Sequence, residues 1–141
     1  MPPAIKQSLS SALTLIICAF LLIEGIWGLF SPVVYWVFTT NHAHAIIHIV
    51  LGIAGLVARW KGVIKGFFGF LGSLLIVVAV IWIVPAWREV PRELLNVNGA
   101  VATLNLVLGI VALVIAFTEN ARRRFGTGRT NPPMKLPRKT A

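Results

Sequence analysis

The sequence predicts an all-α integral membrane protein with four transmembrane helices, arranged as two parallel helical-hairpin repeats with both termini in the cytoplasm. Three observations predict this fold: long apolar runs, an internal duplication and a one-sided distribution of basic residues. Of the 141 residues, 57% are hydrophobic and only 12% are charged. An ordinary soluble domain carries about twice that charged fraction. The chain therefore belongs in a lipid bilayer.

Four charge-poor runs are each close to the length of a membrane-spanning helix. A hydrocarbon layer about 30 Å thick requires about 20 helical residues, because each residue adds about 1.5 Å. The runs are continuously apolar, whereas membrane β-strands alternate apolar and polar residues. We therefore expect helices over residues 8–30, 42–58, 63–84 and 99–117.

A duplication relates the second apolar run to the fourth. Residues 41–57 and 98–114 are identical at nine of seventeen aligned positions. Because the repeat returns after two spans, both copies have the same orientation in the membrane, which implies a pseudo-two-fold axis along the membrane normal. The transmembrane domain, residues 8–118, then divides into a first repeat over 8–60 and a second over 61–118.

The formal net charge of +9 is unevenly distributed between the two sides of the membrane. If the spans alternate in direction, eleven of the thirteen Lys and Arg lie on one side, and only Arg88 and Arg92 lie on the other. The positive-inside rule places the basic side in the cytoplasm. Residues 1–7 and a basic tail over 119–141 are then cytoplasmic. We expect the tail to be flexible and to contact anionic lipid headgroups rather than nucleic acid.

Asn41 and Asn98 stand at equivalent positions, where the second and fourth helices begin. Asn is a favoured N-cap because its side chain accepts an unpaired backbone N–H. In lipid, the close approach of helices depends on small residues. We therefore assign helix packing to five glycines in or beside the spans: Gly52, Gly62, Gly66, Gly69 and Gly109.

Glu24 and His48 are ionisable residues inside the predicted spans, which makes them the first candidates for a functional site. Glu24 lies seven residues before the expected helix end at Ser31, and His48 lies seven residues after Asn41. Both then lie about 10 Å below the outer boundary, at about 1.5 Å per residue. Because consecutive antiparallel helices are usually neighbours, we expect these two side chains to face each other as an intramembrane polar pair.

His44 lies one helical turn from His48, on the same face of the helix, and Gly52 lies one turn beyond His48. A His pair at this spacing can chelate a metal, and a His beside a small residue can ligate a tetrapyrrole such as haem or chlorophyll. Three roles stay open for His48: a structural pair with Glu24, cofactor binding together with His44, and proton transfer with Glu24.

The second copy of the duplicated block has no histidine. Asn105 stands where the first copy has His48, and we expect Asn105 to face the third helix near Val80. No third fixed ligand accompanies the two histidines, and no nucleophile–base pair, phosphate loop or zinc signature occurs in the sequence. We therefore expect neither a metal site nor an enzyme.

Three short features of the chain recur in a known family. They are the motif His48-x-x-x-Gly52 after an Asn-containing turn, the return of that block between Val97-Asn98 and Gly109, and the basic turn Arg59–Lys65. Over roughly residues 10–118 the chain thus resembles the small bacterial four-helix membrane proteins grouped as DUF4383. The family pattern has an Asn three residues before the His and a His in the second block, where this chain has Ala45 and Asn105. The resemblance implies the fold and a bacterial membrane location, because the family has no established activity.

Small size and few buried functional groups favour a non-catalytic accessory or scaffold subunit of a larger bacterial membrane complex. Its expected partners are membrane lipids and other membrane protein subunits, in a bacterial cytoplasmic (inner) or thylakoid membrane. Two alternatives follow from the polar residues. One is a pigment- or haem-binding subunit ligated through His48, and the other is a small proton-coupled carrier that uses Glu24 and His48.

Overall fold

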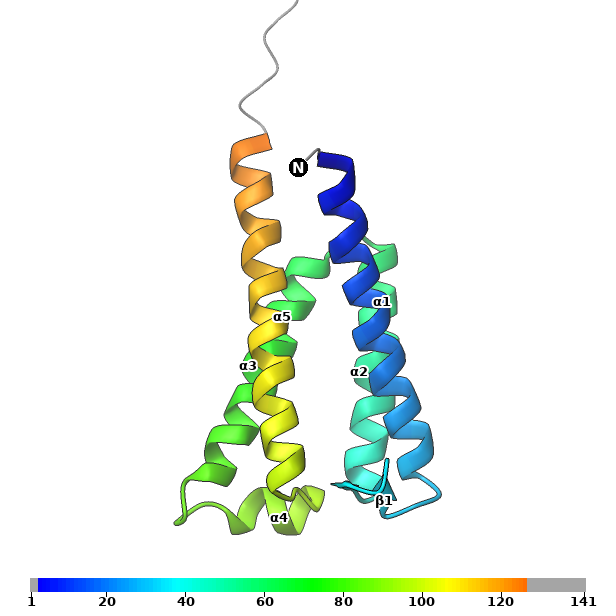
Figure 1. Ribbon diagram of the computed structural model, residues 1–141, viewed down its shortest axis with the longest axis vertical. Helices are drawn as coiled ribbons and strands as arrows, with labels where there is room; N and C mark the ends of the chain where they lie inside the picture. Colours follow the sequence, from blue (N-terminus) through cyan, green and yellow to red (C-terminus); the bar gives the residue numbers. More distant parts are fainter. Residues whose placement is uncertain (1–2, 127–141) are drawn as a thin grey trace, which may run out of the picture.

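The computed structural model describes residues 3–126, with side chains over residues 11–118. Its secondary structure consists of helices and one small β-hairpin, joined by short turns (Figure 1). Within this part of the chain, four helices are long and apolar enough to cross a membrane. These spans are Ser11–Gly28, His42–Trp60, Ile64–Ile83 and Gly99–Thr118. The prediction of an all-α protein with four potential membrane spans is confirmed.

The elements follow one another in a simple order along the chain. They are α1 (Pro3–Gly28), β1 (Val33–Val34), β2 (Phe38–Thr39), α2 (His42–Trp60), α3 (Ile64–Ile83), α4 (Glu89–Leu95) and α5 (Gly99–Gly126). The short strands, α4 and their connections lie together at one end of the bundle, which we call the α4 end (Figure 1). The start of α1, the turn between α2 and α3, and the last turns of α5 lie toward the opposite end.

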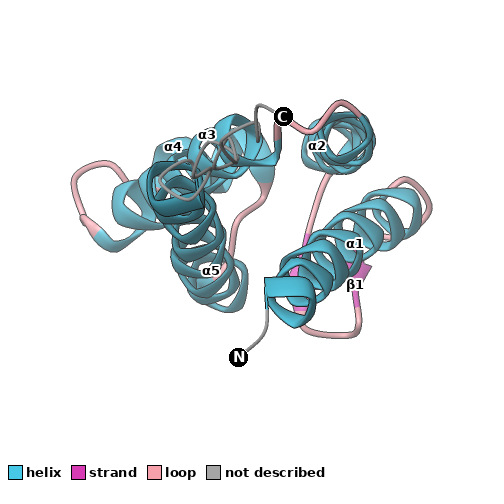
Figure 2. Cartoon of the chain, turned by 90° about the horizontal axis from the view of Figure 1, so that it is seen from above, coloured by secondary structure: helices cyan, strands magenta, loops and turns pink. Residues whose placement is uncertain are grey.

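The four long helices form two pairs, α1 with α2 and α3 with α5 (Figure 2). Glycines permit the close approach within each pair. A Cβ added at Gly52 on α2 would lie 2.6 Å from Leu22 Cγ on α1. A Cβ added at Gly109 on α5 would lie 2.7 Å from Ile76 Cγ1 and 3.0 Å from the Gly72 carbonyl oxygen on α3. Because real Cβ atoms do not approach other atoms so closely, these positions require glycine.

Large side chains, rather than close backbones, join the two pairs. Phe68 and Leu71 of α3 are fully buried and pack in one cluster with Leu21 of α1, Leu51 of α2 and Ile115 of α5. All four long helices therefore contribute to a single apolar core. The contact between the pairs is nevertheless much less extensive than the contact within either pair.

Three of the five glycines assigned to helix packing have open space where a side chain would stand, as far as the described residues show. A Cβ added at Gly62, Gly66 or Gly69 would meet no atom within 4 Å. Gly62 is required by its backbone instead, because its φ of +69° is in the left-handed region, and it ends the turn after α2. Gly66 and Gly69 lie on the outward side of α3, so helix packing at these positions stays a prediction for contacts with another chain.

Both connections at the α4 end are more ordered than plain loops. β1 and β2 pair antiparallel, with Val33 opposite Thr39 and Val34 opposite Phe38. The sequence analysis expects only a loop between the first two spans and does not identify this hairpin. In the second connection, Asn96 ends α4 in the left-handed conformation, with φ of 52°. Asn tolerates this conformation better than most residues, which explains its place there.

The tail expected to be flexible from residue 119 onward begins as helix. α5 continues to Gly126, well beyond the apolar span that ends at Thr118. Residues 127–141, which carry part of the predicted basic tail, lie outside the described residues. The boundary at 118 therefore marks the end of the apolar span and not the end of the helix.

Candidate functional site

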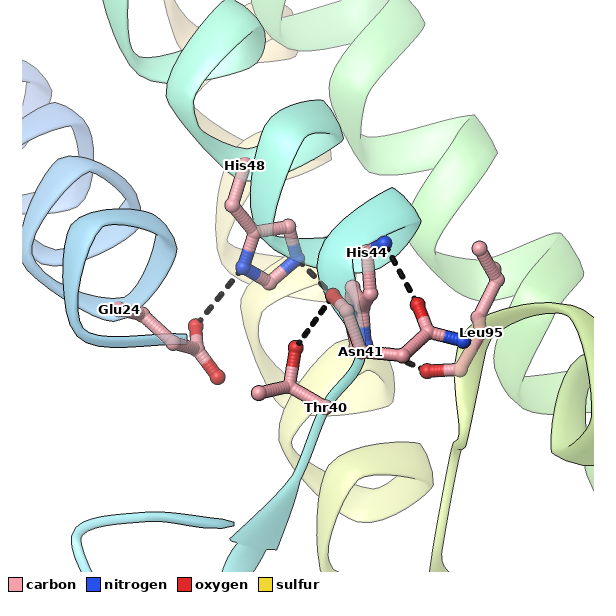
Figure 3. A network of polar contacts seen from close by, with 6 residues as sticks. All are labelled: Glu24, Thr40, Asn41, His44, His48 and Leu95. Carbon is pink, nitrogen blue, oxygen red and sulfur yellow. Dashed lines mark hydrogen bonds and ion pairs between the residues drawn. The ribbon is translucent and has the colours of Figure 1, made fainter. Parts of the chain in front are cut away.

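A row of buried polar side chains lies between α1 and α2 near the α4 end (Figure 3). Glu24, His44 and His48 are each 4–5% exposed. His48 Nδ1 lies 3.0 Å from Glu24 Oε2, and His48 Nε2 lies 3.1 Å from His44 Nε2. His44 Nδ1 continues the row to the Leu95 carbonyl oxygen at 2.9 Å. The structure thus brings Glu24 and His48 together as expected, and it adds His44 to the same row.

The contacts of the row determine where its protons lie. The Leu95 carbonyl can only accept, so His44 Nδ1 must carry a hydrogen and donate it. The two Nε2 atoms are too close to be two lone pairs, so they share one proton. His48 Nδ1 and Glu24 Oε2 lie at ion-pair distance, but no hydrogen bond joins them. The contacts therefore fix the hydrogen on His44 Nδ1 and require one hydrogen between the two Nε2 atoms.

Glu24 is the least satisfied member of this row. Its Oε2 atom is fully enclosed and accepts no hydrogen bond from the part of the chain that the structure describes, although His48 Nδ1 lies at ion-pair distance. A buried carboxylate is costly unless a cation or several donors compensate its charge. The position of Glu24 is thus favourable only while the imidazole of His48 stays beside it.

Asn41 and Asn98 both cap their helices as predicted, and each also reaches across to the other half of the chain. Asn41 Oδ1 accepts from the His44 N–H, and Asn98 Oδ1 accepts from the Val101 N–H, both at 2.9 Å. Asn41 Nδ2 donates to the Leu94 carbonyl at 3.0 Å.

Asn98 makes the corresponding bond to the first half of the chain, where its Nδ2 donates to the Val37 carbonyl at 2.9 Å. The two acceptors, Val37 and Leu94, are separated by the same 57 residues as the two donors, Asn41 and Asn98. The cross-links are therefore reciprocal, and capping alone does not account for the two asparagines.

Further side-chain bonds join the same two connections. Asn96 Nδ2 donates to the Thr40 carbonyl at 2.9 Å, and Thr39 Oγ1 donates to the Asn96 carbonyl. Together with His44 and the two capping asparagines, they form a set of hydrogen bonds between the two halves of the chain, which we call the polar latch. The latch was missed from the sequence because most of its acceptors are backbone carbonyls, which every residue possesses.

Asn105 shares a cavity with Leu75 and Val78 of the third helix, and the same cavity is lined by the two histidines. The cavity has a volume of about 90 Å³, and Leu95 also lines it. Asn105 is 4% exposed, and its side chain has no hydrogen-bond partner within the described residues. The two copies of the duplicated block thus direct their polar residues into one shared space. His42, by contrast, is exposed and lines a separate open groove.

Comparisons of this chain with protein-family models, with curated proteins and with solved structures find no match. The functional reading therefore depends on the geometry of the polar row, the cavity and the surface of the four helices.

Proposed function

We propose that this protein is a non-catalytic, multi-pass accessory subunit that docks on a larger bacterial membrane complex through the outward face of α3. The observation that supports the proposal is a strip of α3 where glycines leave open space beside the helix. Gly66, Gly69 and Ser73 follow one another at helical spacing, and no described part of the chain occupies the space beside the two glycines. Small residues on a membrane helix favour close approach of another helix.

The burial of the four spans supports the same choice of surface. Buried residues make up 28% of the α3 span and 39% of each of the other three spans. Ser73 adds little polarity to the outward face, because its hydroxyl donates to the Gly69 carbonyl at 2.9 Å. α3 therefore has the smallest share of buried residues among the four spans, and Gly66 and Gly69 form a shallow strip along it.

The proposed setting is a bacterial inner or thylakoid membrane with both termini in the cytoplasm. The basic residues Arg59, Lys61 and Lys65 at the end opposite α4 support this orientation. We further propose that the two helix pairs are repeats of one hairpin. The reciprocal bonds of Asn41 and Asn98 and the equivalent close contacts at Gly52 and Gly109 support that origin.

Replacing Gly66 by Leu should abolish docking without affecting the fold. The added side chain projects into space that is empty in the isolated chain, and Leu favours helix more than Gly does by about 0.8 kcal/mol. In a mild detergent extract of native membranes, the wild-type protein should migrate with its partner and the Gly66→Leu variant should migrate alone.

A control variant tests whether a larger side chain at any lipid-facing position disrupts the complex, or only one on α3. Val107 on α5 is 53% exposed, and Val107→Leu should leave the complex intact. A wild-type protein that runs alone under these conditions, or a Gly66→Leu variant that still runs with its partner, contradicts the docking proposal.

A proton-coupled carrier is the second candidate, and the polar row is the observation that favours it. Glu24, His48 and His44 form a continuous series that can pass a proton along its length. Toward the opposite end, α1 adds Cys18 and Thr14, both fully buried. Under this function Glu24→Gln should abolish proton flux into proteoliposomes, and Glu93→Gln on the exposed surface of α4 should not. Equal flux in the two variants removes Glu24 from the mechanism.

A haem- or chlorophyll-binding subunit has less support from this geometry. All four ring nitrogens of His44 and His48 already face a partner. The adjoining cavity of about 90 Å³ is small beside the roughly 300–1,000 Å³ of pockets for larger organic ligands. A tetrapyrrole would require the two helix pairs to separate.

A further inference from the structure

The two histidines of α2 are placed as a pair of metal ligands. His44 and His48 stand four residues apart on one face of the helix, which is the spacing of the two His ligands in helical zinc sites. Their Nε2 atoms are 3.1 Å apart. An ion at about 2.0–2.1 Å from each nitrogen would form an N–metal–N angle of about 98°, close to tetrahedral.

The other nitrogen of each ring is held as metal-binding histidines require. A ligating His usually directs its second nitrogen to a carboxylate or a backbone carbonyl, which fixes the ring and raises its basicity. His48 Nδ1 lies 3.0 Å from the Glu24 carboxylate, and His44 Nδ1 donates to the Leu95 carbonyl at 2.9 Å. Both imidazoles therefore present Nε2, and both orienting groups come from other helices.

Asn105 supplies the third polar group. Within the described residues no set of three His, Cys, Asp or Glu side chains comes together, so these residue types alone do not reveal a site. Asn105 is 4% exposed and lines the same cavity as the two histidines, and its side chain makes no hydrogen bond within the described residues. Its amide atoms are not among the fully enclosed polar atoms that lack a partner, so they are open to the cavity and available to a ligand there.

The cavity has suitable size and surroundings for an ion. Its volume of about 90 Å³ has room for a metal ion with one or two waters, at about 30 Å³ per water. The remaining walls are Leu, Ile and Val side chains, which exclude competing polar ligands. A bound cation would also compensate the carboxylate of Glu24, whose Oε2 lacks a hydrogen bond.

We propose that His44, His48 and Asn105 bind one divalent transition-metal ion of the class that imidazole prefers, such as Zn²⁺, Cu²⁺ or Co²⁺. Two imidazole nitrogens and the amide oxygen ligate the ion, and a water completes the coordination. The ion takes the place of the proton that the two Nε2 atoms share, and this proton passes to solvent. The site is independent of docking through α3 and goes beyond the accessory function.

The full-length protein, purified in detergent without a histidine tag, tests this site. Co²⁺ is the probe, because its visible absorption distinguishes tetrahedral nitrogen and oxygen ligation from the hydrated ion. Zn²⁺ then competes in a calorimetric titration. The variants are His44→Gln, His48→Gln, Asn105→Leu and Glu24→Gln, and His42→Gln is the matched control outside the cavity.

The wild type should bind one ion per chain, and His42→Gln should bind it equally well. Replacing either His44 or His48 should weaken binding by at least 100-fold. Glu24→Gln should weaken it by about 10–100-fold, as loss of an orienting partner does at other metal sites. Asn105→Leu should weaken it about tenfold, and it removes an unpartnered buried amide, so this variant is expected to fold.

Two results overturn the proposal. One is binding by the wild type no tighter than by His44→Gln or His48→Gln, with far-ultraviolet circular dichroism showing that the variants are folded. The other is unchanged affinity and Co²⁺ spectrum in Asn105→Leu. A gel-filtration profile of each variant shows whether weaker binding comes from a folding defect or from loss of a metal ligand.

Discussion

Replacing His48 by Leu should destabilise the fold by about 1–3 kcal/mol, the cost of leaving a buried polar group without its partner. Glu24 is 4% exposed and would then lie in the apolar interior with no imidazole beside it. His44 would also lose its contact at Nε2. The measurement is unfolding of the protein in mixed micelles by increasing sodium dodecyl sulfate, with helix content followed by circular dichroism.

The second change, Glu24→Leu, should restore most of that stability to the His48→Leu variant. Replacing both members of a buried pair by apolar groups is often nearly neutral, because no uncompensated group remains. His42→Leu on the exposed side of α2 serves as the control and should stay within about 0.5 kcal/mol of the wild type. A double variant as unstable as His48→Leu alone contradicts the pairing.

Gly72→Leu should separate α3 from α5 and destabilise the protein by about 3 kcal/mol, at the upper end of overpacking effects. A Cβ at Gly72 would lie 2.8 Å from the Gly109 carbonyl oxygen and 2.8 Å from Leu113 Cγ. The backbone oxygen cannot move aside, so the helices must part. The same detergent unfolding experiment measures the loss.

Gly66→Leu is the matched comparison on the same helix. A Cβ at Gly66 meets nothing within 4 Å, so its free energy of unfolding should equal or slightly exceed that of the wild type. Equal destabilisation by Gly66→Leu and Gly72→Leu would show that helix propensity or lipid contact, rather than the α3–α5 interface, governs both positions.

The position of Glu24 beside His48 was predictable because membrane depth follows from counting residues. Each side chain lies the same number of residues from its end of the span, and adjacent antiparallel helices bring equal depths together. The capping by Asn41 and Asn98 was predictable for a similar reason, since an N-cap bond is local in sequence. The depth of a residue in the membrane and its local hydrogen bonds can be predicted without knowing which faces of the helices meet.

The face that a residue presents was less predictable. Gly66, Gly69 and Gly72 look alike in sequence, yet only Gly72 lies against a neighbouring helix. A glycine permits close approach without specifying the partner. The cavity that Asn105 shares with the histidines could not be predicted for a related reason. It depends on how the two helix pairs meet, and that contact is made by bulky side chains such as Phe68 and Leu71.

The polar latch also constrains the order in which the protein can be made. His44 and Asn41 of the first hairpin find their acceptors, Leu95 and Leu94, 51 and 53 residues later in the chain. A ribosome completes the first hairpin before these acceptors exist. During that interval the new hairpin has polar groups at its α4 end that only water, lipid headgroups or an insertion factor can satisfy. The two halves can therefore join only after the second hairpin has been made.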